Sequence, residues 1–442
     1  MATVPEVIWT ALSTCTQCHG NQPLEKLPNS NGRNTHVASV WDGVQWSSTT
    51  HGTKECRKCK TRYKLNYIAK AKFKQNTLNG QTLDDNSIIL IHPHIGFVHR
   101  YLHLLWQRIC RGNLSATAEA SSILLADTTS EIGHTAKNPF KKRNRISDDA
   151  LGRLILTALF NYLRFKDKCY DFNVCDPIPK GDPIYDTPLE DVHIIFNDPH
   201  NDPHMKRFGK VDVVTDGNQP LSRKLHNDEK HHLKRLAGRP KSSNNQRKKN
   251  KSSRCLAISN GVEDIVASRS FTGGLFVTVS LHVNGTGHGN RIVQLAEMKN
   301  SECKAYKVKL LKALTTKTCG SKKVKVGKYC HDCGCTMQEL EGELCDSMYL
   351  DAYHSKKHKC GYKAITKKEF PHLNSQAAEQ LWSKIEKLQS TISHFCRPRY
   401  RFFLRHLCLW RNDFTSRSSR ESQRPDINPA ISKRRASKRY LM

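Results

Sequence analysis

The stretch Val211-Asp212-Val213-Val214-Thr215-Asp216-Gly217-Asn218 is an apolar run that reaches an aspartate and then a turn sequence. Val and Thr favour strands, whereas Gly and Asn favour turns, so the stretch predicts a strand that ends near Asp216. Two more acids stand out: Asp332 follows the apolar run 324–329, and Glu379 opens a predicted helix within 374–383. Strand ends and a helix start can aim carboxylates at one pair of divalent cations. We therefore expect Asp216, Asp332 and Glu379 to form a metal-dependent catalytic site that acts on nucleic acid.

Strand and helix patterns alternate around these acids. Strand patterns cover 275–283, 291–297 and 324–329, and helix patterns cover 301–314, the Glu379 segment and 398–410. This order matches a ribonuclease H-like core, in which the first and fourth strands are neighbours and would bring Asp216 and Asp332 together. We expect a mixed α/β (α+β) chain with this core, an N-terminal zinc-ribbon-like domain and a C-terminal helical layer.

The same residues also have a purely structural interpretation. Asp216-Gly217-Asn218 is an ordinary turn sequence, and a glutamate such as Glu379 suits the positive end of any helix dipole. Taken singly, each acid is therefore weak evidence for catalysis.

The charge of the chain points to a polyanionic partner. Its 442 residues include 72 Lys and Arg against 40 Asp and Glu, which gives a formal net charge of +32. Nucleic acid is the expected partner, double-stranded DNA first, with RNA as an open alternative. The alternative is a soluble protein with basic tails and no polyanionic partner. The excess of Lys and Arg is spread over several segments rather than one tail, which favours the polyanionic partner.

The cysteines indicate a reducing compartment. The chain has 17 cysteines, but its start lacks the apolar core of a signal peptide, so thiols or zinc ligands are expected rather than disulfides. There is also no apolar run of about 18 residues, and we expect no membrane span.

Two CxxC motifs near the start predict a structural zinc site. They are Cys15-Thr16-Gln17-Cys18 and Cys56-Arg57-Lys58-Cys59. Two such knuckles supply the four thiolates of a closed tetrahedral site, and a hairpin built on Asp42-Gly43 is expected between them. A pair of redox-active motifs is the rival interpretation, although no thioredoxin-like βαβ pattern surrounds either motif.

A second group of soft ligands surrounds Asp332. It comprises Cys330, Cys333, Cys335, His354, His358 and Cys360, with Cys345 close by in the sequence. Zn²⁺ favours thiolate and imidazole ligands, so a second zinc site is possible, but the sequence does not select four of them. Buried thiols and exposed histidines are the plainer alternative.

Composition divides the chain into five parts. We expect a cysteine-cluster zinc-binding domain over 1–110, a linker over 111–146 and a helical or irregular connector over 147–209. The ribonuclease H-like domain follows over 210–415 with a basic insertion at 222–254, and a basic disordered tail covers 416–442.

Basic clusters supply candidate contacts to nucleic acid. Arg239 lies in a Gly-Arg-Pro sequence that resembles a minor-groove AT-hook, although Ala237 stands where an arginine is usual. Arg247, Lys248 and Lys249 could neutralise phosphates or direct nuclear import, and we expect a nuclear protein.

The succession of short motifs resembles the transposases of the Kyakuja, Dileera and Zisupton (KDZ) superfamily. The resemblance rests on Thr215-Asp216-Gly217-Asn218, His331-Asp332-Cys333, the His354-x3-His358-x-Cys360 stretch and Glu379-Gln380-Leu381-Trp382-Ser383. The paired CxxC segment likewise looks like the cysteine-cluster modules that accompany such transposases.

The resemblance implies a cut-and-paste transposase. Asp216, Asp332 and Glu379 would be its DDE triad, and Mg²⁺ or Mn²⁺ its catalytic ions. His331 differs from the tyrosine that the family pattern has before the second aspartate. A host-adopted, catalytically inactive zinc-dependent DNA-binding regulator is therefore the competing hypothesis.

Overall fold

The computed structural model describes about half of the chain. The described residues are 7–10, 12–18, 22–27, 34–65, 67–70, 73–76, 83–92, 94–111, 114–129, 147–169, 176–179, 193–195, 209–218, 221–222, 224–225, 272, 274–281, 291–298, 304–316, 318–319, 322–331, 342–350, 363, 368–370 and 373–422. Every structural statement below concerns these residues.

The chain forms two compact units, Met1–Lys180 and Gly181–Met442. Together they contain helices and several β-sheets, so the expected mixed α+β class is confirmed. Among the described helices, none combines the length and the apolar character that a membrane crossing requires.

The first sheet of the N-terminal unit has the strand order β1-β4-β3-β10-β9. Its strands are β1 (Val7–Ile8), β3 (Thr35–Trp41), β4 (Trp46–Gly52), β9 (Ile88–His92) and β10 (Ile95–Val98). β3 and β4 form the predicted hairpin, but their connection is the longer loop 42–45 rather than two residues. Asp42 explains the longer loop, because its Oδ1 accepts the backbone N–H groups of Val44 at 2.8 Å and Gln45 at 2.9 Å.

The second sheet of this unit carries the cysteine motifs. Its order is β2-β5-β6-β7-β8, and its strands are β2 (Leu24–Lys26), β5 (Lys54–Cys56), β6 (Arg62–Tyr63), β7 (Tyr67–Lys70) and β8 (Phe73–Asn76). All neighbours are antiparallel. The hairpin expected to join the two knuckles thus belongs to the other sheet, where Trp46 of β4 packs against Phe97 of β10.

Among its described residues the N-terminal unit also has three helices, α1 (His99–Cys110), α2 (Ala116–Thr129) and α3 (Asp148–Lys166). α3 opens the segment 147–209, which was expected to be a helical or irregular connector, and the Oγ of Ser147 accepts the N–H of Ala150 at 3.3 Å as an N-cap. Helix α1 begins at His99, directly after β10, whose Phe97 pairs with strands on both sides. The segment 111–146, expected as a linker, includes α2, which packs on α3 through small and apolar residues such as Ala120.

The C-terminal unit is built on a sheet with the order β11-β14-β13-β12-β17-β18. The strands are β11 (His193–Ile195), β12 (Val211–Asn218), β13 (Gly274–Ser280), β14 (Ile292–Met298), β17 (Val326–His331) and β18 (Cys345–Leu350), with a small separate pair β15 (Thr318–Cys319) and β16 (Lys322–Lys323). β12 is antiparallel to β13 and parallel to β17, and β17 is parallel to β18. The expectation that the strand of Asp216 lies beside the strand that leads to Asp332 is therefore confirmed.

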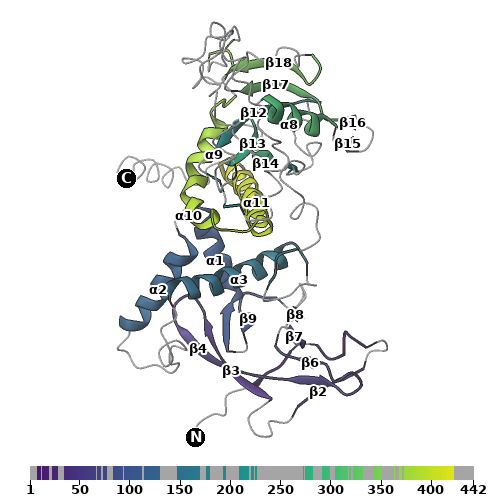
Figure 1. Ribbon diagram of the computed structural model, residues 1–442, viewed down its shortest axis with the longest axis vertical. Helices are drawn as coiled ribbons and strands as arrows, with labels where there is room; N and C mark the ends of the chain where they lie inside the picture. The colour runs from purple at the N-terminus through teal and green to yellow at the C-terminus, as the bar shows by residue number, and fades with distance from the viewer. Residues whose placement is uncertain are drawn as a thin grey trace, which may run out of the picture. The chain divides into compact units, whose positions relative to one another are not determined.

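Helices lie on both sides of this sheet (Figure 1), α8 (Lys304–Thr316) on one side and α9 (Ala377–Ile385) and α11 (Arg397–Ser422) on the other. The short helices η5 (Glu386–Leu388) and α10 (Gln389–Ile392) connect the latter two. Leu311 and Leu314 of α8 share a core with Val211 and Val213 of β12. α11 extends to Ser422, beyond the predicted end at 410 and into the segment 416–442 that was expected to be disordered.

Several boundaries differ from the sequence-based expectation. β17 begins and ends later than the predicted strand 324–329, and α8 begins later than the predicted helix 301–314. Strand ends are set by pairing with neighbours, and β17 continues to His331 because it pairs with β18 up to Leu350.

A buried aspartate joins the neighbouring strands β12 and β17. Asp212 on β12 is 4% exposed, and its Oδ1 accepts the backbone N–H of Lys328 on β17 at 2.7 Å. The Asp212 carboxylate fills the space that a side chain at residue 327 would need. A Cβ built on Gly327 would lie 2.5 Å from Asp212 Oδ1.

We therefore expect Gly327→Ala to destabilise the protein by about 1–3 kcal/mol, because the methyl group displaces a buried, hydrogen-bonded carboxylate. Gly152→Ala on α3 adds the same methyl group where the nearest atom lies at an ordinary 3.5 Å. It should leave stability unchanged or raised, since alanine favours helices over glycine. Denaturant unfolding of both variants checks this, and equal stability of the two would contradict the role of Asp212.

Candidate metal centre

The first CxxC motif lies in a tight turn just before β2. The backbone N–H of Cys15 donates to the carbonyl of Gln22 at 2.7 Å, and that of Leu24 donates to Ser13 at 2.8 Å. These bonds close the chain around the motif. As a result, Cys15 is buried and Cys18 half-buried on the inner side of the turn.

The second motif starts at the last residue of β5. Lys60 N–H donates to the carbonyl of Cys56 at 2.8 Å, and Cys56 N–H donates to the carbonyl of Thr61 at 3.0 Å. Lys60 has a φ of 55°, a left-handed conformation that lets the chain reverse into β6. The turn places Cys59 opposite the first motif.

The four cysteines converge on one point. The sulfur atoms of Cys15, Cys18, Cys56 and Cys59 all lie within 4.8 Å of one another. Cys15 Sγ is 3.6 Å from Cys59 Sγ, and Cys18 Sγ is 3.7 Å from Cys56 Sγ. Four thiolates at the usual zinc–sulfur distance of a tetrahedral site would be about 3.8 Å apart. The residues therefore fit a structural metal ion, and these two contacts join the motifs to each other, as one four-thiolate site requires.

A buried tyrosine contacts the cysteine cluster. Tyr63 on β6 is fully buried, its hydroxyl lies 3.1 Å from Cys15 Sγ, and it accepts the backbone N–H of Thr16 at 2.9 Å. Gln17 N–H also donates to Cys15 Sγ at 3.4 Å. Such outer contacts orient a thiolate ligand and stabilise its charge. Nothing in the sequence singled out Tyr63.

The thiols influence one another electrostatically. Hydrogen bonds with Thr61 lower the pKa of Cys59 to about 6. The pKa of Cys18 is raised to about 12, first by its hydrogen bond with Cys59 and then by burial and the other two thiols. Four sulfur atoms this close cannot all ionise without a cation between them, so a divalent ion would complete the charge balance of the site.

The three acids of the predicted catalytic site are only partly within the described residues. Asp216 is half-buried on β12, with its Oδ1 accepting the N–H of Gly217 at 2.8 Å, and its partner in the sheet is Val277. Glu379 is half-buried in the first turn of α9, which contacts both β12 and β13. Asp332 lies outside the described residues and directly follows His331, which ends β17.

The second group of soft ligands is described only at Cys330 and Cys345. Both are buried, but Cys345 pairs with Val326 at the start of β17 whereas Cys330 pairs with Tyr349 near its end. Positions this far apart on parallel strands are separated by about 13 Å. The structure therefore does not bring Cys345 to Cys330. The remaining candidates, Cys333, Cys335, His354, His358 and Cys360, lie outside the described residues.

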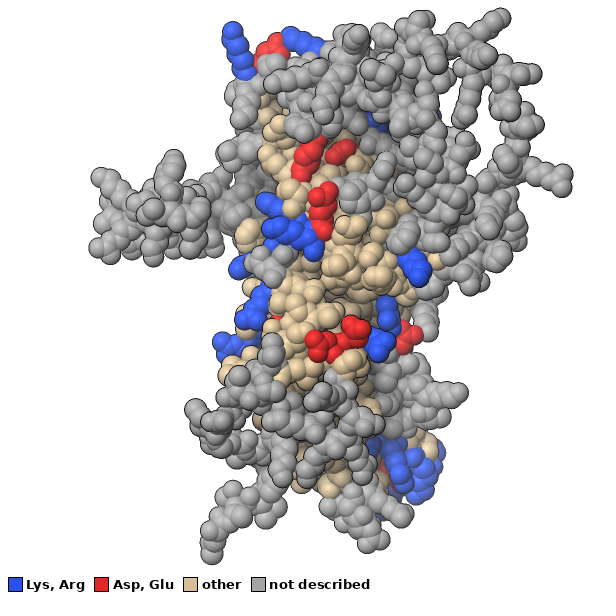
Figure 2. Space-filling model, turned by 60° about the vertical axis from the view of Figure 1, so that its left-hand side comes forward, with Lys and Arg blue, Asp and Glu red and all other residues tan. Residues whose placement is uncertain are grey.

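The basic candidates also lie outside the described part of the chain. Arg239, Arg247, Lys248 and Lys249 belong to this group, and their contact with nucleic acid stays a prediction. On the face drawn in Figure 2, the basic and acidic side chains that the structure describes are interspersed.

Comparison with known proteins bears on the cysteine module. No curated protein and no solved structure matches the chain. Residues 3–123, which include all four clustered cysteines, match the family model of the CxC5-like cysteine cluster associated with KDZ transposases, so the predicted resemblance of this module is confirmed.

Proposed function

We propose that this chain is a transposon-derived nuclear protein that binds double-stranded DNA, holds Zn²⁺ in its cysteine cluster and carries a ribonuclease H-like catalytic core. The observation that carries the proposal is the match of residues 3–123 to a cluster associated with KDZ transposases. The net charge of +32 supports a polyanionic partner.

The sheet of the C-terminal unit supports the proposed core. Without the edge strand β11, the strand order of this sheet is β14-β13-β12-β17-β18. If these five strands are numbered by their sequence order, the order across the sheet is 3-2-1-4-5. The first three strands are antiparallel neighbours and the last two run parallel to the first. A ribonuclease H-like sheet has this order and these directions.

The same sheet supports the proposed catalytic triad. The paired residues Val214 and Cys330 lie on parallel strands, and each precedes one of the two aspartates by two positions in the sequence. Helix α9, which contains Glu379 in its first turn, contacts the strand of Asp216. Asp216, Asp332 and Glu379 would bind Mg²⁺ or Mn²⁺, and these ions would activate a water or 3′ hydroxyl and stabilise the leaving oxygen.

The proposal is tested by metal-dependent cleavage of a labelled duplex by the full chain. Asp216→Asn, Asp332→Asn and Glu379→Gln should each reduce cleavage by about a hundredfold or more, since a catalytic ion stabilises the transition state by several kcal/mol. Asp413→Asn on α11 changes the charge equally at an exposed position and should cleave normally. Cleavage that is unchanged in all three variants would contradict the triad.

A catalytically inactive DNA-binding regulator is the second candidate. The observation that favours it is His331, which is buried beside Tyr329 at the position where the transposase pattern has a tyrosine. Under this alternative the wild type binds duplex DNA and contains zinc, but cleaves no better than the three variants. Loss of duplex binding in the wild type would contradict both candidates.

A further inference from the structure

A cleft of about 500 Å³ lies in the N-terminal unit, away from the cysteine cluster. It is bounded by the β3–β4 loop and helices α1 and α2. Trp41, Leu114 and Ile123 form its apolar walls, and Arg108 and Glu119 its main polar groups. Its volume falls within the range of small-ligand sites.

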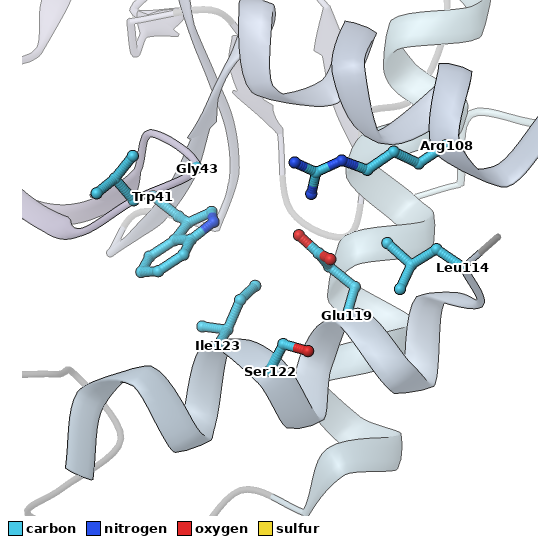
Figure 3. Close-up of a pocket in the computed structure, with 8 residues that line it drawn as sticks. Trp41, Gly43, Arg108, Leu114, Glu119, Ser122 and Ile123 are labelled. Carbon is cyan, nitrogen blue, oxygen red and sulfur yellow. The ribbon is translucent and has the colours of Figure 1, made fainter. Parts of the chain in front are cut away.

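Two opposite charges face each other across this cleft without pairing. Glu119 is only 6% exposed, and its Oε1 accepts the hydroxyl of Tyr101 at 2.9 Å. Figure 3 shows the guanidinium of Arg108 and the carboxylate of Glu119 directed toward one another. Within the described part of the chain, neither an ion pair nor a hydrogen bond joins them. A ligand that fits between them needs hydrogen-bond donors for Glu119 and an anionic group for Arg108.

The wall of the cleft holds a further polar group without a partner. Trp41 is 5% exposed, and its Nε1–H is buried without an acceptor among the described residues. In Figure 3 the indole nitrogen lies on the side of the ring that faces Glu119 and Arg108. An unpaired buried donor costs free energy, so a ligand acceptor that reaches it when the indole turns toward the cleft would be favoured.

Nucleotides combine these features. A nucleobase has a flat apolar face, a nucleotide carries an anionic phosphate, and the net charge of +32 favours such a ligand over a cationic one. Among the bases, guanine presents two adjacent donors, N1–H and N2–H₂, beside the O6 acceptor. A carboxylate next to an N–H donor is complementary to this edge, whereas thymine offers a single donor.

We propose that the cleft binds an unpaired guanine nucleotide. Glu119 accepts from N1–H and N2–H₂, Trp41 donates to O6, Arg108 pairs with the phosphate, and Leu114 and Ile123 contact the base. This inference deepens the proposed function and rests on its nucleic-acid binding. It assigns base recognition to the cysteine-cluster unit, while the C-terminal unit would carry the cleavage.

The test uses the zinc-loaded full chain and labelled single-stranded oligonucleotides of seven nucleotides. All positions carry thymine except the central one, at which the base is varied. Guanine at that position should tighten binding about tenfold over thymine, and inosine, which lacks the N2 amino group, should lose most of the gain. Glu119→Gln keeps an acceptor for Tyr101 and Trp41→Phe keeps an aromatic ring, yet both should remove the guanine preference. Arg100→Gln, an exposed arginine on the same helix as Arg108, should retain it.

Competition with free dGMP distinguishes the two sources of the nucleotide. Displacement by dGMP supports a site for the free nucleotide, and guanine preference without displacement supports a site for a base within a strand. Equal affinity for oligonucleotides with central guanine and central thymine overturns the inference, and so does a guanine preference that survives in Glu119→Gln. Displacement of the oligonucleotide by a lysine-rich peptide, but not by dGMP, overturns it as well. Duplex binding is measured in parallel: if it is intact while guanine preference is absent, only the cleft assignment fails.

Discussion

Replacing Cys56 by serine is expected to release the metal ion and to unfold the sheet that carries the cysteine motifs. The described apolar cluster around the metal centre is small: Cys15, Cys56 and Tyr63 are buried, and Leu12, Cys18 and Leu24 pack around them. A cluster of this size contributes little to folding by itself, whereas a structural zinc site contributes about 10–16 kcal/mol to folding in small zinc domains. Loss of one thiolate should remove most of that contribution.

Elemental analysis and thermal unfolding check this prediction. The wild type should contain about one zinc ion per four-thiolate site, and a strong chelator should lower its melting temperature to that of Cys56→Ser. Cys169→Ser changes a half-buried cysteine of the same unit that lies outside the cluster, so it should keep both zinc and stability. The predicted zinc site would be contradicted if the purified wild type contained no metal and its melting temperature were the same with and without the chelator.

Arg401→Met is expected to destabilise the C-terminal unit by about 3–5 kcal/mol. Arg401 on α11 and Glu297 on β14 form an ion pair with Nε and Oε2 3.3 Å apart, and each side chain is only 4% exposed. Removing the guanidinium takes the positive charge of Arg401 away from a carboxylate that is buried between sheet and helix. The cost is large because the pair has almost no access to water.

A double variant and a surface pair provide the controls. Glu297→Leu combined with Arg401→Met removes both charges and should recover most of the lost stability. Asp346→Asn breaks the exposed ion pair with Lys210 and should cost about 1 kcal/mol or less. Denaturant unfolding measures all three, and a double variant no more stable than Arg401→Met would contradict the electrostatic explanation.

The local patterns of the chain predicted many of its elements. The CxxC spacing predicted the metal centre, because two residues between cysteines allow a turn that directs both sulfur atoms to one side. The order of apolar runs from Val211 predicted that β12 and β17 are neighbours. These features depend on residues close together in sequence, or on the order of elements, and the sequence contains both.

Other features depend on contacts between distant residues, and only the tertiary structure decided them. The composition of 111–146 indicated a linker, but α3 offers α2 an apolar surface, and packing outweighs composition there. The hairpin of β3 and β4 was expected between the knuckles and lies in a separate sheet, because its inward side chains find their partners on β10 and α1.

The sequence by itself determined the class of the chain, its cysteine cluster and the neighbouring positions of β12 and β17, because spacing, periodicity and the order of elements can be read along the chain. It did not reveal the pairing of Glu297 with Arg401, the contact of Tyr63 with Cys15, or the facing of Arg108 and Glu119 across a cleft. Each of these joins residues from separate elements, and a single polar side chain has no periodic pattern that could announce its partner. Such pairs form only when the sheets and helices pack, so the folded chain alone decides them.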